Sequence, residues 1–176
     1  MKKHVALIFV LSVLSIGFAQ EQVVYKEIGD IHLTLDIYYP PNLEANKTHP
    51  GMVFFFGGGW KKGSISQFEP HAKHLSQKGI ICFLADYRVS SRHNTPPFES
   101  LKDAKSAIRF VRENAKKYKV DPNKIIASGG SAGGHLAAAT ALIVGYNDLK
   151  DDLATSCVPN ALVLFNPVID NGPGGY

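Results

Sequence analysis

The sequence predicts an α/β fold with an open, mostly parallel sheet and helices on both of its faces. Two observations support this fold class. Short apolar runs typical of buried parallel strands alternate with longer segments of helical periodicity between residues 52 and 165. Before them, residues 32–38 alternate polar and apolar side chains, which is typical of an antiparallel strand with one solvated face. The 176 residues suffice for one domain with a sizeable core.

The first 19 residues have the pattern of a secretory signal peptide. Two lysines precede an apolar run over residues 5–18, and Gly17 and Ala19 are the small residues of a cleavage site after Ala19. The run is short for a membrane span, so we expect no stable membrane anchor. Cleavage removes two lysines and no acids, which lowers the formal net charge from +4 to +2. We therefore expect residues 20–176 to form a secreted or periplasmic domain that binds no nucleic acid.

Apolar and periodic segments predict the individual elements in chain order. Strands are expected over residues 23–28, 31–39, 52–56, 80–84, 125–127 and 161–165. Helices are expected over residues 64–78, 98–118 and 135–144. Ser64 is a suitable N-cap for the first helix, and Gly79 is suited to end it. The charged residues of the second helix are interpreted as a solvated face; they are Lys102, Asp103, Lys105, Arg109, Arg112 and Glu113.

Several residues invite a metal, disulfide or phosphate hypothesis. Cys82 lies in an apolar strand and is interpreted as a buried free thiol, with a disulfide to Cys157 as the alternative. His71 and His74 are interpreted as surface histidines of the first helix. Because no Cys, His or Asp spacing resembles a zinc site, we expect no metal and no cofactor. The glycine-rich segment 57–64 lacks the Lys-Ser/Thr pair of a phosphate-binding loop.

The sequence G-x-S-x-G occupies residues 129–133, between a predicted strand and a predicted helix. A serine on such a sharp turn is held in a strained backbone conformation, and the flanking glycines remove Cβ atoms that would clash. The hydroxyl of Ser131 is then exposed at the amino end of a helix, where free N–H groups favour negative charge. A plain Gly/Ser turn is the alternative, but the strand–turn–helix context favours a nucleophile.

Three unusual segments follow predicted strands: residues 57–60, residues 86–88 and Ser131. Ligands bind at the carboxyl ends of the strands in open α/β sheets, so we expect a site at this edge. A serine that transfers acyl groups needs a base and N–H donors for the oxyanion. The glycine-rich loop and Ala132, the residue after the serine, can supply such donors.

Together these segments resemble the α/β-hydrolase esterases of the hormone-sensitive-lipase and acetyl-esterase type, including the exported branch near feruloyl and acetyl-xylan esterases. The matching stretches are FFFGGGWKKGS, ADYR, DAKSAIRFVRENA, DPNKI and GGSAGGHLAA. The resemblance implies that Ser131 is the nucleophile and that Gly57, Gly58 and Ala132 form the oxyanion hole. It implies a secreted serine esterase that forms an acyl-enzyme on a small-molecule or carbohydrate ester, such as a short acyl ester or an acetylated or feruloylated sugar.

The chain departs from the family pattern at two positions near the site and in its extent. Phe56 stands where the family usually has a His before the glycines, and Gly130 stands where an acidic residue is common. In this fold an Asp or Glu and then a His follow the serine. Here the one later histidine is His135, which we expect to pack beneath the turn rather than act as the base.

These departures predict an incomplete α/β-hydrolase domain that lacks its C-terminal strands and helices, together with the catalytic acid and His. We expect such a chain to be inactive alone and its last strand to be an open sheet edge. A non-catalytic binding protein on a hydrolase scaffold is the alternative, and a peptidase shares the same turn. Loss of ester hydrolysis on replacing Ser131 would favour the esterase, and failure of a fluorophosphonate to label the full-length protein would favour the binding protein.

Overall fold

The computed structural model describes residues 20–44, 46–170 and 172–174. Their strands form one six-stranded sheet in the order β1-β2-β4-β3-β5-β6. The strands are β1 (Gln20–Ile28), β2 (Ile31–Tyr38), β3 (His49–Phe55), β4 (Ile81–Ala85), β5 (Val120–Gly130) and β6 (Ala161–Phe165). β1, β2 and β4 pair antiparallel, whereas β4, β3, β5 and β6 pair parallel. The predicted mostly parallel sheet is confirmed; the predicted signal peptide, residues 1–19, lies outside the described residues.

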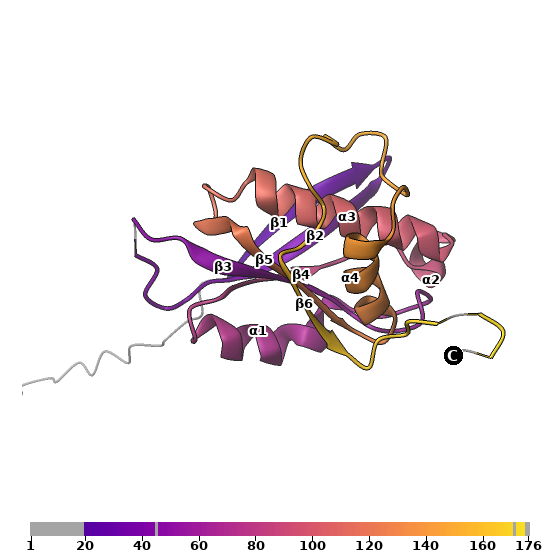
Figure 1. The fold of residues 1–176 in the computed structure, drawn as a ribbon, viewed down its shortest axis with the longest axis horizontal. Helices are drawn as coiled ribbons and strands as arrows, with labels where there is room; N and C mark the ends of the chain where they lie inside the picture. The colour runs from indigo at the N-terminus through magenta and orange to yellow at the C-terminus, as the bar shows by residue number, and fades with distance from the viewer. Residues whose placement is uncertain (1–19, 45, 171, 175–176) are drawn as a thin grey trace, which may run out of the picture.

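Helices cover both faces of the sheet, as predicted. They are η1 (Ile65–Phe68, a 3₁₀ helix), α1 (Glu69–Ser76), α2 (Ser90–His93), α3 (Pro97–Glu113) and α4 (Ala132–Leu142). α1 lies on one face, and α3 and α4 lie on the other (Figure 1). The single helix expected over residues 64–78 is wrong in part. Ser64 accepts a hydrogen bond from Ser66 N–H and caps η1, and α1 begins at Glu69 with Pro70 in its first turn, whose missing N–H interrupts the hydrogen bonds between the two helices.

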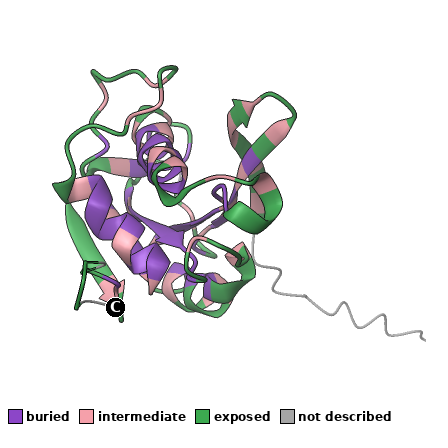
Figure 2. Cartoon of the chain, turned by 90° about the vertical axis from the view of Figure 1, so that its right-hand side faces the viewer, coloured by how far each residue is buried: buried purple, intermediate pink, exposed green. Residues whose placement is uncertain are grey.

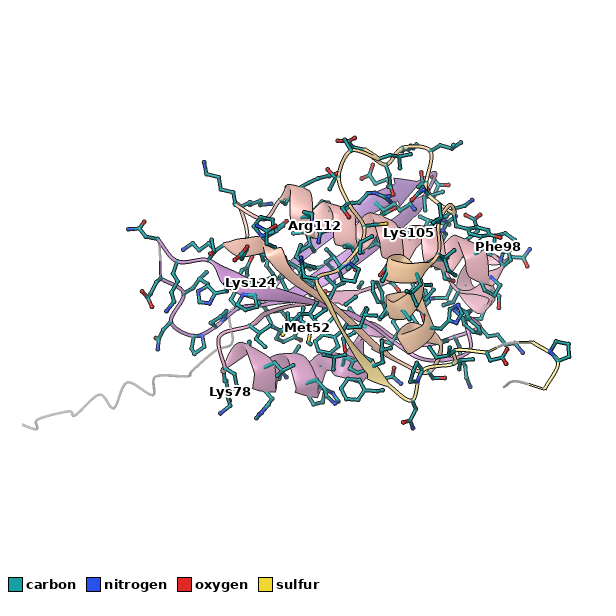
Figure 3. All side chains as sticks on the ribbon, viewed as in Figure 1. Met52, Lys78, Phe98, Lys105, Arg112 and Lys124 are labelled. Carbon is teal, nitrogen blue, oxygen red and sulfur yellow. The ribbon has the colours of Figure 1, made fainter. Side chains whose placement is uncertain are left out.

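The core has two layers because successive side chains of a strand point to opposite faces of the sheet. Val53 and Phe55 of β3 belong to the larger layer beneath α3 and α4. Met52 and Phe54 belong to the smaller layer above α1, and Figure 3 places Met52 between the sheet and that helix. Burial is concentrated in the central strands and in α4 (Figure 2). Both layers therefore hold β3 rigidly at the centre of the sheet.

The order of connections predicts a binding site at the carboxyl ends of β3 and β5. The chain leaves β3 through α1 on one face to reach β4, then returns through α3 on the opposite face to β5, on the other side of β3. Adjacent parallel strands whose following helices lie on opposite faces leave a crevice at their carboxyl ends. The loop after β3 and the serine after β5 both lie at this point.

The interpretation of the charged residues of α3 as a solvated face is wrong for three of them. Asp103, Lys105 and Arg109 expose 0%, 1% and 5% of their surface. The reason is that α3 is covered on this side by β1 and by the loop after α4, so its polar face is buried in turn. The loop is held there by α3, since Arg109 donates hydrogen bonds to Asp151 and Asn147.

Each buried charge of α3 has a partner. Asp103 accepts two hydrogen bonds of 2.8 Å from the Arg88 guanidinium and lies 2.7 Å from Lys26 Nζ. Lys105 donates to the carbonyl of Ile143 at 2.7 Å, just beyond the end of α4 (Figure 3). Burial lowers the pKa of Lys105. A lysine at this place also satisfies a carbonyl that the end of α4 leaves free.

Cys82 is a buried free thiol, as predicted, and burial raises its pKa to about 12. Cys157 is free and buried as well. None of the helices among the described residues combines the length and the apolar character that crossing a membrane requires.

We predict that Asp103→Ala lowers the free energy of unfolding by about 3–5 kcal/mol, because it removes the fully buried carboxylate that Arg88 and Lys26 share and leaves each cation with one partly exposed acidic partner, Glu99 or Asp148. The measurement is urea unfolding of the purified protein. Glu44→Ala is the control: the ion pair between Glu44 and Lys47 is exposed, and its loss should cost under about 1 kcal/mol. Equal effects of the two substitutions would contradict a structural role for the buried network.

Candidate active site

Ser131 lies on a sharp turn between β5 and α4, in a backbone conformation that non-glycine residues rarely adopt. Its φ is 51° and its ψ is −120°. Three backbone hydrogen bonds hold it there. Its N–H donates to Phe165 O at 3.0 Å, and its carbonyl accepts from the N–H groups of His135 at 3.0 Å and Val168 at 3.2 Å. Such strain persists only where the surrounding structure enforces it.

The two glycines that flank the motif are required by close backbone contacts. A Cβ atom on Gly133 would lie 2.0 Å from the carbonyl oxygen of Phe55, and one on Gly129 would lie 2.4 Å from the carbonyl oxygen of Gly133. Gly130 is different, since the nearest atom to its Cβ would be a ring carbon of Phe68 at 3.4 Å. The turn therefore needs glycine at 129 and 133, whereas position 130 has room for a Cβ atom.

The glycine-rich loop after β3 lies directly against this turn. A Cβ on Gly57 would lie 3.4 Å from Ser131 Cβ and 2.9 Å from Gly130 O. Gly58 and Gly59 have φ values of 133° and 64°. A Cβ on Gly58 would also meet Lys62 O at 2.0 Å. The predicted meeting of these two segments at one edge of the sheet is confirmed, and the loop conformation explains the run of glycines.

The N–H groups of the predicted oxyanion hole differ in their availability. Ala132 is the first residue of α4, so its N–H has no partner within the helix. Among the described residues no acceptor bonds the N–H of Gly58 or Gly59. The N–H of Gly57, in contrast, donates to Gln67 Oε1 at 2.5 Å. Gly58 and Ala132 are thus free to bind an oxyanion, whereas Gly57 is free only when Gln67 moves away.

Phe56 is buried and orders the start of the loop by stacking. Its ring lies 4.1 Å from that of Tyr87, with 14° between the two planes. The Tyr87 hydroxyl donates to the Phe56 carbonyl at 2.6 Å, and burial raises the pKa of this phenol. A phenylalanine at this position therefore leaves the loop ordered, although it has no polar group of its own.

The third segment expected at the edge, residues 86–88, has a structural role. The carboxylate of Asp86 pairs with Arg92 at 2.5 Å. Arg88 pairs with Asp103, and the Tyr87 hydroxyl donates a hydrogen bond to Phe56, the residue before the glycine-rich loop. These side chains hold β4, α2 and α3 in place, and none of them forms a hydrogen bond or ion pair with Ser131.

His135 and His71 make packing contacts. His135 Nδ1 lies 2.6 Å from Val168 O, and its ring meets Trp60 edge-on at 5.3 Å. This agrees with the expectation that His135 packs beneath the turn. His71 is exposed and its ring lies 5.5 Å from that of Phe165. Among the described residues no side chain hydrogen-bonds Ser131 Oγ, and no three His, Cys, Asp or Glu side chains are grouped as a metal site.

Two contributions to the site have no signal in the sequence. Gln67 lies in a segment that was expected to be plain helix, yet its amide bonds the glycine-rich loop. Phe165 and Val168 hold Ser131 through backbone groups, which no side-chain pattern reveals. The G-x-S-x-G motif and the glycine run, in contrast, can be recognised in the sequence, because the backbone at these positions accepts only particular residue types.

The sheet, the strained serine and the adjacent glycine-rich loop define an α/β-hydrolase of the esterase type. A family model described as BD-FAE matches residues 35–172. The chain therefore belongs to the BD-FAE family, in agreement with the resemblance seen in its sequence.

Individual relatives agree with this assignment. The probable carboxylic ester hydrolase LipM of Mycobacterium tuberculosis is 38% identical over 119 residues, which are 67% of this chain and 27% of that protein. Endo-1,4-beta-xylanase B of Butyrivibrio fibrisolvens is 31% identical over 68% of this chain and 20% of its own length.

Esterase 2 of Thermogutta terrifontis has a solved structure that superposes with a TM-score of 0.83 at 46% identity, covering 85% of this chain and 56% of the other. That esterase has also been solved phosphorylated by paraoxon and with butyrate bound. The chain thus spans about half of the length of this esterase and about a quarter of LipM.

We predict that Gly133→Ala destabilises the protein by about 2–3 kcal/mol, because its Cβ has no space against the backbone of β3. Gly130→Ala is the matched control: its Cβ meets only ordinary contacts, so we expect a change of less than about 1 kcal/mol. Urea unfolding of the two variants measures the difference. A Gly133→Ala variant as stable as Gly130→Ala would mean that the turn is not packed as described.

Proposed function

We propose that this chain provides the nucleophile and the oxyanion hole of a secreted serine esterase that hydrolyses carboxylic esters through an acyl-enzyme. The observation that supports this best is the strained Ser131 beside free N–H groups of Gly58 and Ala132. Similarity to LipM and to the Thermogutta esterase, which are named as ester hydrolases, points the same way.

In the proposed reaction Ser131 Oγ attacks the carbonyl carbon of the ester. The carbonyl oxygen becomes negative in the tetrahedral intermediate, and the N–H groups of Ala132 and Gly58 stabilise it. The alcohol leaves with a proton, and water then attacks the acyl group on Ser131 to release the acid. Because no described histidine side chain hydrogen-bonds Ser131 Oγ, the proposal assigns the base and its acid partner to residues that these 176 do not include.

Short acyl esters of small molecules or of sugars are the proposed substrates. The signal-peptide pattern of residues 1–19 would bring the enzyme to extracellular or periplasmic material. A relative named for xylan cleavage favours a carbohydrate ester, such as an acetylated or feruloylated sugar. The butyrate found in the Thermogutta esterase favours a short acyl group.

We predict that Ser131→Ala lowers the kcat for p-nitrophenyl acetate by a factor on the order of 10⁵–10⁶, since the covalent step is lost. The test uses the protein expressed from the complete reading frame that contains this chain. The wild type should react with a fluorophosphonate, as the Thermogutta esterase is phosphorylated by paraoxon. The Ser131→Ala variant should not react. Ser156→Ala, at an exposed serine of the loop before β6, is the control and should behave as the wild type.

Activity retained by Ser131→Ala would contradict the assignment of the nucleophile. A wild-type protein that is folded, hydrolyses no ester and takes up no fluorophosphonate would instead favour a non-catalytic binding protein on a hydrolase scaffold.

A further inference from the structure

Gln67 bonds the glycine-rich loop at the point where the loop touches Ser131. Its Oε1 accepts the N–H of Gly57 at 2.5 Å. The position of a Cβ on Gly57 lies 3.5 Å from that oxygen and 3.4 Å from Ser131 Cβ. The amide oxygen of Gln67 is therefore within about 7 Å of the β-carbon of Ser131, the sum of these two distances.

The backbone of Gln67 is held by its neighbours, so this hydrogen bond joins the loop to a fixed support. The N–H of Gln67 donates to Ser64 O at 3.2 Å within η1. The next residue, Phe68, is buried, and its ring stacks on Phe54 of β3 at 5.0 Å. An acceptor carried by such an anchored turn restrains the Gly57 peptide to one orientation.

Two further hydrogen bonds form within the loop, next to the Gly57 peptide that Gln67 restrains. The carbonyl of Gly58 accepts the N–H groups of Lys61 and Lys62 at 3.1 and 3.2 Å. The Gly58 N–H is left without an internal acceptor among the described residues. Once the Gly57 N–H is bound to Gln67 and the Gly58 carbonyl is bound inside the loop, the Gly58 N–H is the first N–H of the loop left without an acceptor among the described residues, directly after the glycine that lies against Ser131.

We propose that Gln67 is a positioning residue for the oxyanion hole. This inference rests on the proposed esterase function. Gln67 keeps the Gly57 N–H out of the hole and orients the loop so that the Gly58 N–H points to the same place as the N–H of Ala132. The opposite arrangement, in which Gly57 is itself a donor and Gln67 competes with the oxyanion for it, predicts the opposite effect of removing the side chain.

The amide of Gln67 also suits its place by being neutral. A carboxylate at the same position could accept the same hydrogen bond but would add a negative charge close to the developing oxyanion. Gln67→Glu therefore tests separately the ability of this side chain to accept the hydrogen bond and its lack of charge. Protonated at low pH, the new side chain is a neutral acceptor; ionised at higher pH, it repels the transition state.

The experiment compares Gln67→Ala, Gln67→Glu and Gln77→Ala in the protein from the complete reading frame. Gln77 is an exposed glutamine at the end of α1 and serves as the matched control. The measurements are kcat and KM for p-nitrophenyl acetate from pH 4 to pH 9, the midpoint of urea unfolding, and hydrogen exchange of the Gly57 amide.

We expect Gln67→Ala to lower kcat about 10- to 100-fold with KM within about twofold, because the variant stabilises the transition state less well but binds the substrate as before. Exchange of the Gly57 amide should become faster, and Gln77→Ala should change neither quantity. For Gln67→Glu, the rate relative to wild type should be highest at pH 4 and fall several-fold as the new carboxyl group ionises, since an ordinary Glu has a pKa of about 4.3. A merely structural role would shift the unfolding midpoint without this dependence on pH.

A kcat that rises or stays unchanged in Gln67→Ala, with an active wild type, would overturn the role of Gln67 and leave the esterase proposal intact. A rise would identify Gly57 as an oxyanion donor that Gln67 obstructs. A folded wild type with no hydrolysis and no fluorophosphonate labelling would instead defeat the esterase proposal, and the catalytic role of Gln67 with it.

Discussion

The site depends on one packing constraint: the start of α4 lies against the end of β3 with no room for a side chain between them. A Cβ on Gly133 would meet the carbonyl oxygens of Phe55 and Phe56 at 2.0 and 2.3 Å, and one on Gly129 would meet Phe55 O at 2.6 Å. This contact places Ser131 beside the loop that leaves β3. It also brings the free N–H groups of a helix terminus next to those of the loop, so a place for an anion follows from the packing itself.

The loop in turn depends on contacts from three directions. From the segment after β4, Tyr87 stacks on Phe56 and donates to its carbonyl. From η1, Gln67 accepts the N–H of Gly57. From α2, the N–H of Ser90 donates to the carbonyl of Trp60 at 3.0 Å. Preorganised donors stabilise a transition state because they do not have to reorient when charge develops. The substitution of Phe56 for the usual histidine is therefore compensated by stacking.

The sequence predicts the sheet, both helical faces and the place of the candidate site, because each depends on residue type. Buried strands need apolar runs, and the turn at Ser131 needs Gly129 and Gly133. The buried state of Asp103 on α3 is not predictable in this way. A charged residue has the same identity in the sequence whether its side chain faces water or Arg88. The burial of this part of α3 comes from the loop that folds over the helix.

The contacts of Gln67 and Phe56 escape prediction for a related reason. A glutamine near a helix start has no preferred partner in the sequence, and its acceptor role depends on where Gly57 lies in space. The sequence similarly shows that a histidine is absent at Phe56 but not that Tyr87, 31 residues later, orders the same carbonyl. Interactions across the sheet edge are long-range in sequence, so only the folded arrangement reveals them.

The edge strand β6 provides no reacting group in this arrangement, yet the geometry of Ser131 depends on it. Phe165 O accepts the N–H of Ser131, and Val168, just after the strand, donates to its carbonyl. Within the described residues β6 pairs on one side only, as predicted for an open edge. Leu162, Val163 and Phe165 are 36–42% exposed.

A groove of about 440 Å³ separates β6 from α1 and is lined mainly by apolar atoms. Loosening of β6 would remove two of the three backbone bonds that enforce the strained φ of Ser131, and the turn could then relax. Any segment that pairs with this edge or fills the groove would oppose that relaxation. Order at the edge of the sheet and the readiness of the serine to react are therefore thermodynamically linked, although no side chain of β6 takes part in the proposed chemistry.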